Sequence, residues 1–136
     1  MHTKEWKDKW LIPDIKHGIL TKYNFLVHYP ENLSLGKYVD ISQFVYIQAN
    51  GGVIIKDNVE IGPFCAILSE STIDNKKGKI IFKKGCCIGS HSVIMPGIHI
   101  GENSIIGANS FVNKSIPNNV IAWGNPCKVI KKRGAK

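Results

Sequence analysis

Three side chains in the middle of the 136-residue sequence could take up a proton during a reaction: Asp74, His91 and His99. His91 stands directly after Ser90, and Asp74 opens a polar run over residues 74–79. Histidine and carboxylate groups are common general bases, and a hydroxyl group that attacks a carbonyl carbon needs such a base. The plain alternatives are surface histidines and an aspartate that forms a turn. These residues are candidates for a proton-transfer site, provided that the fold brings them to an accessible surface.

The four cysteines offer little further chemistry. Cys65, Cys86, Cys87 and Cys127 contain no C-x-x-C pair, and their spacing fits neither a zinc site nor a disulfide framework. We expect reduced and mostly buried thiols, because free cysteine usually behaves as a small buried hydrophobe. A covalent acyl-enzyme at Cys86 or Cys87 is the alternative, but no His–Cys arrangement supports it.

The composition fits a single domain with an anionic partner. The net charge is +8, and lysines crowd both ends of the chain. This charge suits a phosphorylated small molecule, and no nucleic-acid-binding signature accompanies it. No apolar run is long enough to span a membrane, and the first residues do not resemble a signal peptide. The sequence therefore predicts a cytoplasmic protein with no nucleic-acid or membrane partner.

Aliphatic residues recur at every sixth position and indicate the elements that must position these side chains. The runs are Phe82, Ile88, Ile94, Ile100, Ile106 and Val112; Ile55, Ile61, Ile67 and Ile73; and Leu35, Ile41 and Ile47. On a helix this period would spread the aliphatic residues over three sides, whereas strands tolerate it. Glycines after many of these residues suit corners between short strands. The pattern predicts an all-β solenoid with stacked aliphatic residues inside.

The repeat is interrupted twice and fades at both ends. Two extra residues lie near residues 50–52, and residues 74–79 read as a loop pushed out at a corner. We predict one domain over 1–136, with an N-terminal cap over 1–32, a β-helix over 33–117 and a C-terminal tail over 118–136. A loop that interrupts a regular scaffold is a common place for function.

The C-terminal half resembles a known family. Residues 88–97, residues 100–108, Lys114 with Ile116-Pro117, and residues 124–126 (Gly-Asn-Pro) together are similar to the hexapeptide-repeat acyltransferases. The resemblance covers about residues 33–131. It implies a left-handed parallel β-helix of about four coils, opened by Leu35, Ile55, Phe82 and Ile100. It also implies homotrimers with active sites between subunits.

The same resemblance implies a cofactor and a set of site residues. Acetyl-CoA would act as co-substrate, with its arm along a groove beside the later coils and no metal. By resemblance, the cofactor-binding residues are Ser90, Ala108, Asn113, Lys114, Lys128 and Lys131. A small Ala108 leaves room for the arm, and lysine suits phosphate as a point charge. The structural alternative is that small residues serve tight coils and that lysines cover a solvated surface.

The acceptor is predicted from a departure from the family pattern. Sugar O-acetyltransferases of this family use a histidine before the extended loop, and Thr72 stands at that position. An amine needs less help from a base than a hydroxyl, so this difference favours N-acetylation. The loop resembles that of acetyltransferases of nucleotide-linked amino sugars (dTDP-3-amino-6-deoxyhexoses). Such a substrate belongs to surface polysaccharide synthesis, and the resemblance implies Ser69, Thr72 and Asn75 as substrate-binding residues.

We expect direct attack of the sugar amine on the thioester, with His91 or Asp74 collecting the proton and no acyl-enzyme. An O-acetyltransferase of a sugar or an antibiotic is the nearest alternative. A zinc lyase of the carbonic-anhydrase kind is an alternative of another class, because it can share the fold. Such a lyase needs three converging histidines, and the predicted coils contain only His91 and His99.

Overall fold

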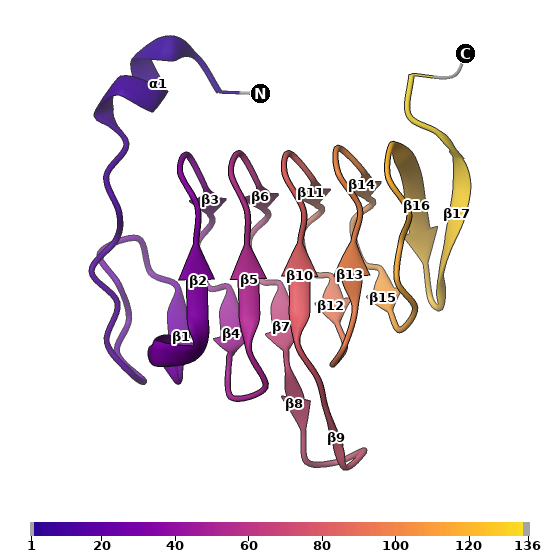
Figure 1. The fold of residues 1–136 in the computed structure, drawn as a ribbon, viewed down its shortest axis with the longest axis horizontal. Coiled ribbons are helices and arrows are strands. Elements are labelled where there is room, and N and C mark those ends of the chain that lie inside the picture. Colours follow the sequence, from indigo (N-terminus) through magenta and orange to yellow (C-terminus); the bar gives the residue numbers. More distant parts are fainter. Residues whose placement is uncertain (1, 135–136) are drawn as a thin grey trace.

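The computed structural model describes residues 2–134, which wind into a parallel β-helix with three flat sheets (Figure 1). Sheet I has the order β1-β4-β7-β12-β15, sheet II the order β13-β10-β5-β2, and sheet III the order β17-β16-β14-β11-β6-β3. The chain passes from sheet II to sheet III to sheet I in each coil. The predicted all-β, left-handed parallel β-helix is confirmed.

The strands are two or three residues long except at the C-terminal end. Sheet I contains β1 (Leu26–His28), β4 (Tyr46–Gln48), β7 (Ala66–Leu68), β12 (Val93–Ile94) and β15 (Phe111–Val112). Sheet II contains β2 (Leu33–Leu35), β5 (Val53–Ile55), β10 (Ile80–Phe82) and β13 (His99–Ile100). Sheet III contains β3 (Asp40–Ile41), β6 (Glu60–Ile61), β11 (Cys87–Ile88), β14 (Ile105–Ile106), β16 (Val120–Gly124) and β17 (Cys127–Lys132).

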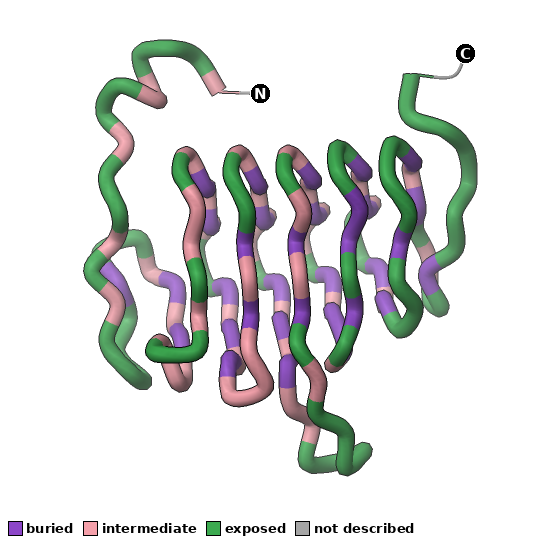
Figure 2. The backbone as a smooth tube through the Cα atoms, in the orientation of Figure 1, coloured by how far each residue is buried: buried purple, intermediate pink, exposed green. Residues whose placement is uncertain are grey.

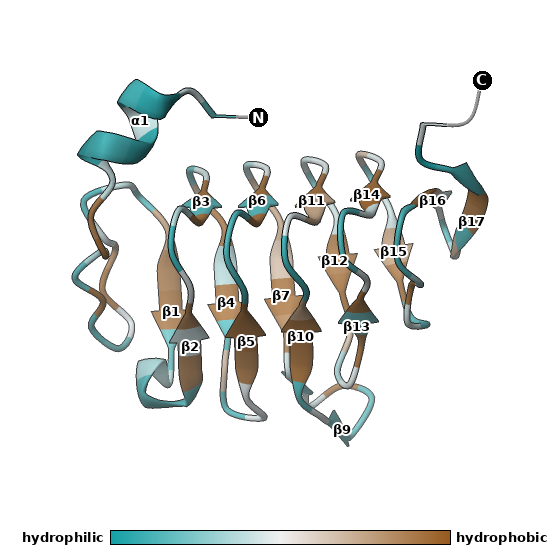
Figure 3. Cartoon of the chain, turned by 45° about the horizontal axis from the view of Figure 1, so that its top comes forward, coloured by the Kyte–Doolittle hydropathy of each residue, from teal (hydrophilic) through white to brown (hydrophobic). Residues whose placement is uncertain are grey.

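The aliphatic repeat forms columns inside the helix. In sheet II, Leu35 pairs with Ile55, Ile55 with Phe82, and Phe82 with Ile100. Figure 2 shows buried positions recurring at the same level of successive coils, and Figure 3 shows that strands such as β5 and β10 are mainly apolar. Burial of this apolar surface is the main stabilising contribution to such a fold.

The helix is longer at both ends than the sequence predicted. Leu35, Ile55, Phe82 and Ile100 do open successive coils, but strand β1 adds a partial coil before them. At the other end, Ile116 bridges to Ile100 and β16 pairs with β14, so a further turn begins after the fourth coil. The solenoid therefore has about five turns, and part of the predicted cap and part of the predicted tail belong to it.

Two of the three corners are built by residues with left-handed backbone angles. At the corner from sheet III to sheet I, called the III–I corner, these residues stand two positions before each strand of sheet I. They are Asn24, Phe44, Phe64, His91 and Asn109, with φ between 58° and 63°. This repeated angle places equivalent residues of successive coils above one another.

The third corner, between sheets I and II, carries an insertion that differs from the predicted loop. Strand β8 (Glu70–Ser71) pairs antiparallel with β9 (Lys76–Lys77), which makes a hairpin that leaves the second coil (Figure 1). Ile73 lies at its tip and is 95% exposed. The prediction that Ile73 continues the buried series after Ile67 is wrong, because the chain leaves the coil at Glu70 rather than at Asp74.

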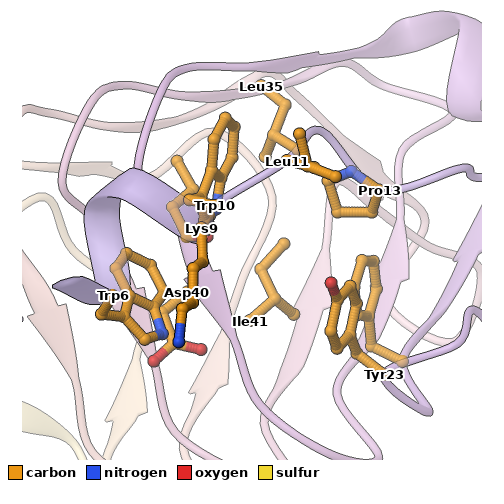
Figure 4. A pocket seen from close by; sticks show the side chains of 11 residues that line it. Trp6, Lys9, Trp10, Leu11, Pro13, Tyr23, Leu35, Asp40 and Ile41 are labelled. Carbon is orange, nitrogen blue, oxygen red and sulfur yellow. Dashed lines mark hydrogen bonds between the residues drawn. The ribbon is translucent and has the colours of Figure 1, made fainter.

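The N-terminal residues cover the first coil. Helix α1 (Lys4–Lys9) begins at Thr3, whose side chain accepts a hydrogen bond from the Trp6 backbone N–H. A cavity of about 220 Å³ remains between this segment and the solenoid, lined among others by Trp6, Trp10 and Ile41 (Figure 4). Within residues 2–134, no helix has the length and hydropathy that a membrane crossing requires.

Candidate functional site

The III–I corner brings two of the predicted cofactor-binding residues together. Ser90 and Ala108 occupy equivalent positions of successive coils, and the Asn109 backbone N–H donates to the Ser90 carbonyl over 2.9 Å. Ala108 is exposed and Ser90 is half-buried. Small side chains therefore leave little bulk on the surface of this corner.

Glycine makes this close stacking possible. A Cβ atom on Gly89 would lie 2.5 Å from the Ala108 backbone nitrogen. The next glycine of the column, Gly107, would bring a Cβ atom within 2.9 Å of the Trp123 Cβ. Only glycine fits where one backbone passes so near the next, so these two positions set the spacing of the coils beneath Ser90 and Ala108.

His91 lies beside this pair, and its backbone N–H donates to the Pro63 carbonyl over 3.1 Å, but its side chain has no hydrogen-bonding partner among the described residues. Its exposed ring stacks on Phe64, with centroids 5.0 Å apart, and Phe64 stacks on Phe44 at 5.5 Å. His99, by contrast, lies on strand β13 in sheet II, where it pairs with Ile81. The two histidines face different sides of the solenoid and do not converge.

The C-terminal hairpin places the predicted phosphate-binding lysines at the end of the corner column. Trp123 of β16 pairs with Lys128 of β17, and Ile121 pairs with Lys131. Both lysines are exposed. Trp123 is 45% exposed, its Cβ lies close to Gly107, and Lys128 is its partner across the hairpin. The sequence analysis did not identify Trp123, because its neighbour Gly107 lies in the preceding coil.

Asn113 and Lys114 lie at another corner. They follow β15 at the corner between sheets I and II, and both are exposed. Ser90 and Ala108 precede strands β12 and β15, whereas Asn113 and Lys114 follow β15. The strands of sheet I therefore separate the two pairs. A ligand that contacts all four must cross the outer face of sheet I at β12 and β15.

The predicted substrate-binding residues lie at two different places of the hairpin. Thr72, Asp74 and Asn75 are exposed at its tip, and Asn75 has a left-handed φ of 52°. Ser69 is fully buried at its base, where its hydroxyl donates to the Gln48 carbonyl and accepts from the Gly51 backbone N–H. Both hydrogen-bonding functions of Ser69 serve the backbone, so Ser69 stays outside the candidate site.

The cysteines do not form a nucleophilic centre. Burial raises the pKa of the Cys86 thiol strongly, and the neighbouring Cys87 adds to the effect. Burial also raises the thiol pKa of Cys65, Cys87 and Cys127. These groups stay protonated at neutral pH, and the thiolate is the nucleophile. Within residues 2–134, no cluster of three or more His, Cys, Asp or Glu side chains is placed to hold a metal ion.

A second group of titratable side chains lies at strands β1 and β4 of sheet I and in the segment before them, and the sequence analysis missed it. Tyr46 Oη and His28 Nδ1 are 2.7 Å apart, and the rings of His17 and His28 stack with centroids 4.8 Å apart. The Tyr29 backbone N–H donates to His17 Nδ1 over 2.8 Å. The pairing of β1 with β4 brings His28 and Tyr46 together, and His17 joins them from the segment before β1.

Comparison with known proteins relates the chain to one class of enzymes. Residues 80–114 match the family described as bacterial transferase hexapeptide (six repeats). The chain is 36% identical to galactoside O-acetyltransferase of Escherichia coli K12 over 123 residues, which are 79% of this chain and 61% of the relative. A maltose O-acetyltransferase structure from Clostridium difficile 630 is 31% identical, with a TM-score of 0.74 over 82% of this chain and 65% of that one.

A galactoside acetyltransferase solved in complex with coenzyme A is 33% identical, with a TM-score of 0.63 over 79% of this chain and 58% of that one. The chain thus spans about three fifths of the length of these relatives. The shared part includes the repeat that carries Ser90 and Ala108.

Proposed function

The chain is related to the hexapeptide-repeat acetyltransferases, and we propose that it transfers an acetyl group from acetyl-CoA to a hydroxyl group of a small sugar. The observation that carries the proposal lies at the III–I corner. There the matched repeat forms a surface of small residues, the half-buried Ser90 and the exposed Ala108, and Trp123 with its pair Lys128 lies in the following turn. A long, phosphorylated cofactor fits such a surface.

The cofactor is assigned along this surface. The pantetheine arm lies beside Ser90 and Ala108, where backbone N–H and C=O groups can bind its amides. Lys128 and Lys131 meet the phosphates as exposed cations, and Trp123 offers an aromatic face for the adenine ring. Asn113 and Lys114 contact the arm from the corner that follows β15, between sheets I and II.

The acceptor is assigned to the region of the hairpin. Thr72, Asp74 and Asn75 present exposed polar groups that suit sugar hydroxyls, and His91 lines the cofactor surface. The chain forms homotrimers with active sites between subunits. The stacked pair Phe44 and Phe64 supports this assembly, because each ring leaves about half of its surface exposed (51% and 52%), as at a surface that a partner covers.

The relatives change the preferred acceptor from an amine to a hydroxyl. Those reported above at more than 30% identity are named for galactosides or maltose. N-acetylation of a nucleotide-linked amino sugar remains the second candidate, because Thr72 replaces the family histidine. In both cases the acceptor attacks the thioester carbonyl carbon directly. The carbon–sulfur bond then breaks, and CoA leaves as the thiol after it takes up a proton.

The developing oxyanion needs hydrogen-bond donors at the reacting carbon. Backbone N–H groups of the III–I corner and the Ser90 hydroxyl are the donors available beside the cofactor surface. Preorganised donors of this kind stabilise the negative charge without reorganisation during the reaction. Ser90→Ala should therefore lower kcat more than it weakens CoA binding.

Calorimetric binding of CoA tests the location of the cofactor. Ala108→Trp should abolish binding, because the indole would fill the space of the arm. Lys37→Trp places the same side chain at an exposed position of another corner and should bind CoA as the wild type does. Equal binding by both variants would remove the cofactor from the III–I corner.

A further inference from the structure

We propose that Glu60 is the general base that takes the proton from the acceptor hydroxyl. The inference rests on the proposed acetyl transfer to a hydroxyl group, which needs a positioned base. Thr72 stands where the family has its histidine, and Asp74 lies with it on the hairpin, across sheet I from Ser90. The side chain of His91 has no described partner that would fix its tautomer.

Glu60 stands two residues before a point of contact with Ser90. Both Glu60 and Gly62 face outward from sheet III, because Ile61 between them is buried in the core. Gly62 lies directly against the Ser90 backbone, since a Cβ atom on it would be 2.9 Å from the Ser90 nitrogen. Two residues of extended chain span at most about 7 Å. The Glu60 Cα therefore lies within about that distance of the Gly62 Cα, which touches Ser90.

The direction of the proposed cofactor surface places the reacting end of acetyl-CoA near this contact. Lys128 and Lys131, the proposed phosphate ligands, lie on the last strand, and the surface leads back through Ala108 to Ser90. The thioester is at the opposite end of the cofactor from the phosphates. In this arrangement it lies at Ser90, on the side of the coil that carries Gly62, and Glu60 faces it from sheet III.

A cavity of about 240 Å³ lies over sheet III, and Glu60 lines it together with Cys87 of the neighbouring strand. Burial, followed by the charge of Glu60, raises the pKa of the Cys87 thiol, as expected for a carboxylate beside it. The Glu60 side chain is 35% exposed, so a hydroxyl group in the cavity can reach it. Further ionisable side chains that line the cavity are His2, Lys7, Lys84 and Arg133.

A contact with His2 holds the carboxylate in place. Glu60 Oε1 lies 3.3 Å from His2 Nε2, which also lies 2.8 Å from Asp40 Oδ2. An ionised carboxylate has about four lone-pair sites on its two oxygens, so it can keep this contact and accept a proton from a substrate. Asp40 pairs with Glu60 in sheet III and shares the same partner, but it stands one coil farther from Ser90.

The proposed homotrimer reconciles this base with the hairpin as acceptor site. Within one subunit the hairpin leaves the corner between sheets I and II, whereas the cavity at Glu60 lies over sheet III. Phe44 and Phe64, the pair that a partner subunit would cover, stand at the III–I corner, which borders sheet III. A partner that packs there can bring its hairpin to an acceptor bound in the cavity.

The proposed step is balanced within the site. The Glu60 carboxylate takes the proton from the acceptor hydroxyl as the hydroxyl oxygen forms a bond to the thioester carbonyl carbon. When the tetrahedral intermediate collapses, the carbon–sulfur bond breaks, and the protonated Glu60 returns the proton to the CoA sulfur. Glu60 ends ionised, and the products are an acetyl ester and CoA–SH.

Steady-state kinetics of Glu60→Gln and the matched control Asp40→Asn test the inference. Each change replaces a carboxylate beside His2 by an amide of the same shape. General-base catalysis contributes about 100-fold or more, so Glu60→Gln should lose that factor in kcat with a hydroxyl acceptor. Asp40→Asn should keep the wild-type kcat. Glu60→Asp, which keeps the carboxylate on a shorter side chain, should fall between the wild type and Glu60→Gln.

The dissociation constant of CoA, measured by calorimetry, should be the same in all three variants, which separates loss of chemistry from loss of the cofactor site. The inference is overturned if Glu60→Gln keeps the wild-type kcat, if Asp40→Asn loses as much, or if Glu60→Gln is at least as active as Glu60→Asp. In each case the proposed acetyl transfer would stand with another base. A wild-type protein that transfers acetyl to no hydroxyl acceptor would overturn the proposed function itself, and this inference with it.

Discussion

The imidazole of His91 stacks on the phenyl ring of Phe64 one coil earlier, with ring centroids 5.0 Å apart and an interplanar angle of 15°. The stack orients the ring along the cofactor surface, but no described residue fixes its tautomer by a hydrogen bond. His91→Ala should therefore raise KM for acetyl-CoA several-fold and leave kcat nearly unchanged, as measured by steady-state kinetics. A large loss of kcat would instead make His91 the base.

The hairpin tip should affect the acceptor and not the cofactor. Removing both Thr72 and Asp74 side chains by alanine substitution should raise KM for the acceptor about tenfold or more, since a hydrogen bond to a charged group contributes about 1.5–3 kcal/mol. The dissociation constant of CoA, measured by calorimetry, should stay constant. Lys37→Ala is the exposed control. A weakened CoA complex in the double variant would show that the hairpin serves the cofactor instead.

Buried serines support the last coils. The Ser104 hydroxyl donates to the Pro117 carbonyl and accepts from the Val120 backbone N–H. Ser104→Ala would leave both backbone groups without that partner, so the free energy of unfolding should fall by about 1–3 kcal/mol. Urea denaturation provides the measurement, with Ser34→Ala on the exposed face of β2 as control. Equal midpoints for the two variants would contradict this role of Ser104.

Buried thiols should make the fold sensitive to alkaline pH. Burial raises the pKa of Cys86 above its ordinary value of 9.0, with a smaller contribution from Cys87. Above pH 9 the unfolded chain loses the thiol proton while the folded chain keeps it, so the free energy of unfolding should fall as pH rises from there. Cys86→Val, which extends the column of Val39 and Val59, should flatten this dependence in urea titrations. An unchanged slope in Cys86→Val would exclude Cys86 as its source.

The sequence predicted the coil register because each hexad contains one short strand and one corner at fixed positions. Leu35, Ile55, Phe82 and Ile100 could be aligned without a structure, since equal spacing places them in one column. Ile73 shows the limit of that reasoning. It keeps the period of six after Ile67, yet the backbone has already left the coil to pair Ser71 with Lys76. Periodicity does not detect such a departure.

The candidate site was predicted in part for a similar reason. Ser90 and Ala108 stand in hexads of equal phase, so their stacking follows from the repeat. The contact between His28 and Tyr46 depends on β1, a single strand of three residues with no preceding hexad to reveal its phase. Trp123 was missed because its position over Gly107 results from the pairing of β14 with β16.

The most direct test of the account is release of CoA thiol from acetyl-CoA by the purified protein, measured with galactosides, maltose and nucleotide-linked amino sugars as acceptors. Mass spectrometry of each product would identify an ester or an amide. The account predicts acceptor-dependent thiol release and an acetyl ester on a galactoside or maltose-type sugar. Acetylation of amino sugars alone would contradict the choice of a hydroxyl acceptor. No acceptor-dependent release with any sugar would contradict the proposed acetyl transfer to sugars.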